Sequence, residues 1–148
     1  MNPQTPAELR LGRQALTVLE AVLVAVAPEE GCALLLGGRD PWCVRRIWPC
    51  LNVWVPPAER CRRFALDPRE QLLAQKWARS RGLTVLGSAH SHPFSEPVPS
   101  ALDLSLAFTP TLMLILGQGP AEGEPRSLAC WWLPEQGSPR RLAWRMVD

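Results

Sequence analysis

Residues 86–103 read LGSAHSHPFSEPVPSALD and contain both histidines of the 148-residue chain, His90 and His92. The apolar pattern over 84–90 predicts a buried strand. Residues two apart on a strand point to the same side, so both imidazoles face one point. Asp103 follows eleven residues after His92, beyond a proline-rich loop that can fold the chain back. Two histidines and one carboxylate, with a fourth position open, are the ligand set of a catalytic zinc site.

Each part of this pattern also has an explanation without chemistry. A single H-x-H occurs in many proteins that bind no metal. Ser100 followed by Asp103 is also what a helix N-cap and an acidic first turn look like, and the helix dipole favours that arrangement. The combination of the three features at the end of a buried strand is what indicates a metal site.

A second segment, residues 28–37, reads PEEGCALLLG and places glutamates directly before another apolar strand. With the HSH and SALD sequences, it makes the chain resemble the JAMM (MPN-plus) zinc metalloproteases. Their signature is a glutamate ahead of an apolar strand, then H-x-H, seven residues and S-x-x-D, and this sequence keeps that spacing. The resemblance extends through residues 52–67 and the closing strands, so it covers essentially the whole chain.

The resemblance implies a role for each signature residue. His90, His92 and Asp103 would hold one Zn²⁺, Glu30 would act as general base, and Ser100 would donate a hydrogen bond to the oxyanion or its bound water. No covalent intermediate is required, and Ser91 and Ser95 are interpreted as loop residues.

The choice between Glu29 and Glu30 also rests on the resemblance. The family's glutamate stands three residues before the small residue that opens the leucine-rich run. Ala33 is that residue here, which selects Glu30. Glu29 is then a solvated neighbour.

The periodicity and turn residues predict helices alternating with strands, and then mostly strands. Helices are expected over 13–26, 69–80 and 100–108, and strands over 8–11, 32–36, 42–48, 62–66, 84–90, 112–116, 127–133 and 141–147. This order predicts an α/β (α+β) single domain over 1–148, a mixed β-sheet flanked by helices, as in the JAMM/MPN (cytidine-deaminase-like) architecture. The apolar face of the second helix is expected at Leu72, Leu73, Lys76 and Trp77, and its N-cap at Asp67 with Pro at the first position.

Composition excludes several partners and compartments. A net charge of +2 with scattered basic residues does not favour nucleic acid. The longest apolar stretch, 15–27, is too short to cross a membrane, which takes about 20 residues. Arg10 and Arg13 ahead of it resemble a signal peptide, but Glu20 interrupts it, and Leu16, Leu19, Leu23 and Val26 follow the spacing of a core-packing helix. We therefore expect a cytoplasmic protein.

The cysteines are expected to be reduced, because the five of them include no CxxC and their number is odd. Cys32 lies near Glu30, but no activating arrangement surrounds it, so a catalytic thiol is not favoured. Most of the seven tryptophans are expected in the core. Trp54 and one of Trp131 and Trp132 are candidates for an exposed pair, which would form a homodimer contact or a docking patch for the substrate.

The function implied by the resemblance is hydrolysis of a peptide or isopeptide bond at the C-terminus of a small ubiquitin-like or sulfur-carrier protein. The chain looks like a compact stand-alone member, without the insertions of larger deubiquitinases. One alternative is a non-catalytic MPN-fold scaffold that binds protein. A zinc deaminase would need H-x-E and P-C-x-x-C, and neither string occurs.

Overall fold

The central strands are apolar over consecutive residues because helices cover both faces of the sheet. In the computed structural model, which describes residues 5–148, β2 (Cys32–Arg39) begins with six buried residues. Its Leu35 packs in one cluster with helix α1 (Arg13–Val24), whereas Leu34 and Leu36 pack in another with helix α2 (Pro68–Ser80). A strand with two covered faces loses the usual apolar–polar alternation.

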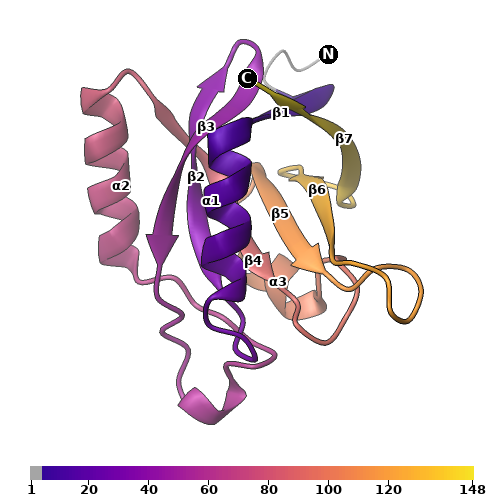
Figure 1. The fold of residues 1–148 in the computed structure, drawn as a ribbon. Helices are drawn as coiled ribbons and strands as arrows, with labels where there is room; N and C mark the ends of the chain where they lie inside the picture. The colour runs from indigo at the N-terminus through magenta and orange to yellow at the C-terminus, as the bar shows by residue number, and fades with distance from the viewer. Residues whose placement is uncertain (1–4) are drawn as a thin grey trace.

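Seven strands form a mixed sheet that closes into a barrel in the order β1-β3-β2-β4-β5-β6-β7 (Figure 1). The other strands are β1 (Glu8–Gly12), β3 (Trp42–Cys50), β4 (Thr84–Ser91), β5 (Thr111–Gly117), β6 (Ser127–Leu133) and β7 (Arg140–Val147). Strand β1 pairs in parallel with both β3 and β7 and so closes the barrel. β4 and β5 are also parallel, and the remaining pairs are antiparallel. The predicted mixed sheet flanked by helices is confirmed.

The strand expected over 62–66 does not exist. The segment that joins β3 to α2 contains only a 3₁₀ turn, η1 (Pro57–Glu59), and is otherwise irregular. Its backbone groups are satisfied locally: Ala65 N–H donates to Asn52 Oδ1, and the Asn52 amide donates to the Arg63 carbonyl. The Ala65 carbonyl accepts from Val53 N–H. Because one asparagine side chain takes these bonds, the segment needs no partner strand.

The apolar face predicted for α2 is confirmed at Trp77, which packs against the cluster between α2 and β2, and is wrong at Leu72 and Leu73. Leu72 and Leu73 are 67% and 54% exposed, and the helix instead buries Ala74 and Ala78 against the sheet. These small side chains let the helix lie close to β2. The expected N-terminus is confirmed, because the Asp67 side chain accepts from Arg69 N–H and Pro68 occupies the first turn.

The two other predicted helices are shorter than expected. Helix α1 ends at Val24, and Val26 lies exposed beyond it. The third helix, α3, covers Ala101–Leu106. Within residues 5–148, no helix is both long and apolar enough to cross a membrane.

None of the seven tryptophans is exposed, but only Trp42 and Trp132 are buried, and the other five are half-buried. Trp132 is buried edge-to-face against Trp42, with ring centroids 5.5 Å apart. Trp54 and Trp131 are half-buried, so the expected exposed pair of tryptophans is wrong. The five cysteines are free thiols and three are buried, with no disulfide among the described residues.

Two adjacent glycines near the end of β2 differ in what surrounds them. The pairing register with β3 shifts between Leu36 and Gly37. A Cβ on Gly37 would collide with the carbonyl oxygen of Cys43, whereas a Cβ on Gly38 would meet nothing within 4 Å. The irregular pairing of β2 with β3 therefore requires a glycine at 37 and not at 38.

We predict that Gly37→Ala lowers the free energy of unfolding by about 1–3 kcal/mol, because backbone must move to admit the methyl group. Gly38→Ala is the matched control and should change it by less than about 1 kcal/mol. Urea denaturation of both variants measures the difference. Equal midpoints for the two variants would show that β2 and β3 are not packed as described.

Candidate metal centre

The two histidines come together at the end of β4. His90 pairs with Cys32 of β2 and Ile115 of β5 and is fully buried. His92 follows the strand directly, and its backbone N–H donates to the Leu116 carbonyl at 2.8 Å. Their Nε2 atoms lie 3.0 Å apart. The expected convergence of the two imidazoles is therefore present.

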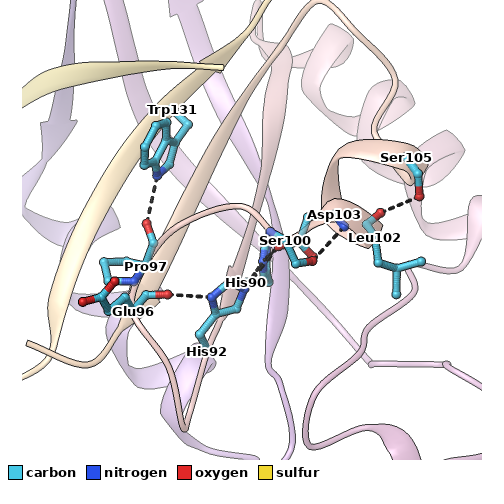
Figure 2. Close-up of polar contacts among 9 residues, drawn as sticks. All are labelled: His90, His92, Glu96, Pro97, Ser100, Leu102, Asp103, Ser105 and Trp131. Carbon is cyan, nitrogen blue, oxygen red and sulfur yellow. Dashed lines mark hydrogen bonds and ion pairs between the residues drawn. The ribbon is translucent and has the colours of Figure 1, made fainter. Parts of the chain in front are cut away.

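Helix α3 brings Asp103 to the same point (Figure 2). Asp103 Oδ2 lies 3.1 Å from His90 Nε2 and 3.2 Å from His92 Nε2. The same oxygen accepts the Ser100 backbone N–H at 2.9 Å, and Ser100 Oγ accepts the Asp103 N–H at 3.0 Å. This reciprocal pair is a capping box. The helix cap and the histidine contacts thus use one and the same carboxylate, so the two explanations of S-x-x-D are compatible.

The protonation of His92 follows from its other nitrogen. Nδ1 lies 2.8 Å from the Glu96 carbonyl oxygen, which can only accept, so Nδ1 carries the proton. In the neutral ring Nε2 then presents a lone pair towards Asp103 and His90. Burial lowers the pKa of His90, against the opposing effect of Asp103, and favours its neutral form. Burial acts the same way on His92, but its contacts with Asp103 and with the Glu96 carbonyl outweigh it and raise the pKa of that ring. Lone pairs converging at this distance repel one another unless a cation or a shared proton lies among them.

Glu30 completes the group from the start of β2. Carboxylate and imidazole atoms of Glu30, His90 and His92 lie within 4.8 Å of one another, so these residues can hold a metal ion. Glu30 is buried, and its Oε1 has no hydrogen-bond partner among the described residues. Burial raises the pKa of this carboxyl to about 7, with His92 opposing the rise and Asp103 adding to it. A buried, unpaired carboxylate oxygen beside two imidazoles is suited to contact a further group in the site.

The backbone next to Glu30 is held tightly. Gly31 N–H donates to Ser91 Oγ at 2.8 Å, Ser91 N–H donates to the Gly31 carbonyl, and Ser91 Oγ donates to the Leu23 carbonyl of α1. A Cβ on Gly31 would come within 2.6 Å of that carbonyl oxygen. Ser91 is therefore a buried strand residue that ties three segments together, and its interpretation as a loop residue is wrong.

Two residues with structural roles in the site were missed from the sequence. Asn52 donates to the Glu30 carbonyl at 3.0 Å, and the phenyl ring of Phe64 stacks on His90 with centroids 4.3 Å apart. Both lie in the irregular segment after β3, where no periodic pattern marks them. The only signal for this segment was the family resemblance over residues 52–67, which assigned neither residue a role.

Neighbouring candidates are not part of the group. Glu29 is half-buried and does not join the carboxylate and imidazole atoms described above. Burial raises the pKa of the Cys32 thiol to about 12, so the thiol stays protonated at neutral pH and is unsuited as a nucleophile.

An apolar groove of about 730 Å³ opens beside Asp103. Its lining residues come mainly from α2, from α3, from the strands β4 and β5, and from residues 64–66 before α2. Its apolar lining includes Phe64, Leu66, Leu72, Leu102, Leu106 and Met113. The exposed Leu72 is thus accounted for, because it faces this groove rather than the core.

Comparison with known proteins agrees with the fold and with the family resemblance. Residues 13–133 match the family model described as prokaryotic homologs of the JAB domain, and the chain belongs to this family. A solution structure of protein DSY2949 from Desulfitobacterium hafniense is similar, with a TM-score of 0.80 and 31% identity, and the match covers 95% of this chain and 93% of that one.

Two curated relatives carry functional names. The desampylase of Haloferax volcanii is 35% identical over 89 residues, which are 60% of this chain and 62% of the relative. A Thermus thermophilus protein named probable TtuB-protein conjugate cleaving protease is 34% identical over 99 residues, or 67% of this chain and 63% of that protein. The chain therefore spans less than two thirds of the length of either relative.

Proposed function

We propose that this protein is a zinc-dependent hydrolase that cleaves a peptide or isopeptide bond at the C-terminus of a small ubiquitin-like or sulfur-carrier protein. The observation that carries the proposal is the meeting of His90 Nε2, His92 Nε2 and Asp103 Oδ2 beside the unpaired carboxylate of Glu30. The names of the two relatives, a desampylase and a probable TtuB-protein conjugate cleaving protease, support it. Residues 1–148 would act as a single cytoplasmic domain, and the free thiols fit that compartment.

The donor atoms fit zinc. Tetrahedral zinc with bonds of about 2.0–2.1 Å separates its ligand atoms by about 3.3 Å. The three contacts among His90, His92 and Asp103 measure 3.0, 3.1 and 3.2 Å. We therefore assign these three residues as the ligands. Glu30 is the other carboxylate within reach, but it makes no such close contact and is better placed as a base.

Glu30 would act as general base and then as general acid. When bound, zinc supplies a water acidified towards neutral pH and polarises the scissile carbonyl. Glu30 Oε1 accepts the proton of the attacking water and returns it to the leaving amine as the C–N bond breaks. Its pKa of about 7 suits both steps, because the carboxyl gains and loses a proton easily at neutral pH.

Ser100 would stabilise the oxyanion. Its Oγ already accepts the Asp103 N–H, so its own hydroxyl proton is free to donate. The side chain is held at the start of α3 next to the ligand Asp103, which orients the donor without further ordering.

The groove beside Asp103 would hold the C-terminal tail of the carrier. It has a mostly apolar lining that includes the ligand Asp103, which suits a peptide tail whose end must reach the site. The same surface would also serve a non-catalytic scaffold, and the metal content decides between the two functions.

The first test is the zinc content of the purified protein. We expect about one zinc per chain, the number a single three-ligand site holds, and its loss in His92→Ala. Elemental analysis of both proteins measures it. If the wild-type protein takes up no zinc even when zinc is offered, the proposed hydrolase function is contradicted. The non-catalytic scaffold then becomes the favoured function.

A second test separates the two neighbouring glutamates. Glu30→Gln should keep its zinc but lower hydrolysis by at least about 100-fold, because an amide cannot accept the proton. Glu29→Gln should retain wild-type activity. The assay follows release of a lysine peptide from a carrier ending in Gly-Gly. If Glu29→Gln lost activity and Glu30→Gln did not, the general base would be Glu29, and its assignment to Glu30 would be wrong.

A third test concerns the groove. Leu106 lies on its α3 wall and is 53% exposed, so Leu106→Glu should fold normally. Losing a leucine contact of roughly 1.5 kcal/mol should raise KM about tenfold with little change in kcat. Val18→Glu is the control, because Val18 is a 44% exposed apolar residue of α1 outside the groove. An unchanged KM in Leu106→Glu would place the tail elsewhere.

A further inference from the structure

The loop between the two halves of the signature is fixed to the barrel along its length. Gln118 N–H donates to the Ser95 carbonyl at 2.8 Å, and Trp131 Nε1 donates to the Pro97 carbonyl at 2.9 Å (Figure 2). A Cβ on Gly117 would come within 2.5 Å of Pro97 N, so the loop backbone lies directly on β5. Residues 93–99, which we call the strap, are therefore held against the barrel by these contacts and do not form a hinged lid.

The strap holds a metal-site residue through one backbone atom. The Glu96 carbonyl accepts the His92 Nδ1 proton at 2.8 Å, so Nε2 is the ring nitrogen that faces Asp103. Glu96 itself is exposed, and its carbonyl also accepts the Val98 N–H at 2.8 Å, on the far side of Pro97. The adjacent residue Pro97 is buried and is the one that the Trp131 indole binds.

We propose that Trp131 is a positioning residue for the metal site. Its indole N–H fixes the Pro97 carbonyl, which fixes the neighbouring Glu96 carbonyl and with it the ring orientation and tautomer of His92. The inference rests on the proposed metal site and adds a residue from β6, far from the signature in sequence. Partners that orient a ligating histidine in this way usually affect metal affinity about 10–100-fold.

Trp131→Phe tests this by removing the N–H while keeping most of the ring. We expect an apparent zinc affinity lower by about tenfold, measured by competition with a chromogenic chelator. The visible d–d bands of the Co²⁺-substituted protein should also change, because they report ligand geometry. Neither readout depends on hydrolysis.

Trp144→Phe is the matched control. Its indole donates to the Leu128 carbonyl at 2.9 Å, so it loses the same kind of bond at the same length, in a strand away from the site. Both variants should lose similar stability in the metal-free state, and only Trp131→Phe should lose metal affinity. Metal affinity equal in the two variants would overturn the inference.

Gly117→Ala is an independent probe should Trp131→Phe fail to fold. Its methyl group would push the strap off β5 and should weaken zinc binding, whereas Gly38→Ala, a strand glycine with open space, should not. Unchanged zinc affinity in Gly117→Ala would overturn the inference. Failure of the wild-type protein to bind zinc would overturn it together with the proposed function, so the two failures are distinguishable.

Discussion

One carboxylate oxygen, Oδ2 of Asp103, organises the site. It faces two imidazole nitrogens and accepts a backbone N–H that caps α3. Burial raises the pKa of Asp103, but the close contacts with His90 and His92 and the hydrogen bond from Ser100 N–H outweigh it and hold that pKa well below its ordinary value. A charged group at this depth is stable only with such partners. Helix α3, the strap before it and strand β4 must therefore all be placed so that Asp103 Oδ2 meets the two imidazoles.

The barrel supplies the rigid frame for that contact. Apolar side chains fill both faces of β2 and β4, so these strands cannot shift without exposing or overpacking their neighbours. The polar residues stand where this apolar packing ends. Glu30 precedes β2 and His92 follows β4, and these two antiparallel strands bring their ends together. The site thus combines low solvent access with fixed geometry, which strengthens its electrostatics.

Much of the fold and of the site composition was predictable. The short apolar runs bounded by turn residues placed most strands correctly, and the Asp-Pro pair placed the N-terminus of α2, because these signals are local. Residues 62–66 were wrongly predicted as a strand. Backbone groups of Arg63 and Ala65 instead form hydrogen bonds with the side chain of Asn52, which lies earlier in the chain. The face of α2 was also predicted wrongly at Leu72 and Leu73: they are the more apolar residues, but Ala74 and Ala78 fit close to the sheet. Hydropathy alone does not contain that steric preference.

The sequence by itself determined which groups meet at the site, because H-x-H on a strand and S-x-x-D at a helix start dictate local directions for His90, His92 and Asp103. It also determined that both faces of the central strands are covered. Only the tertiary structure decided how these groups are held. Asn52, Phe64, Ser91 and Trp131 act through backbone carbonyls, ring stacking and close approach of segments far apart in the chain, and such contacts leave no periodic trace in the sequence. The groove beside Asp103 depends in the same way on the distance between α2 and α3, which the packing of the whole barrel sets.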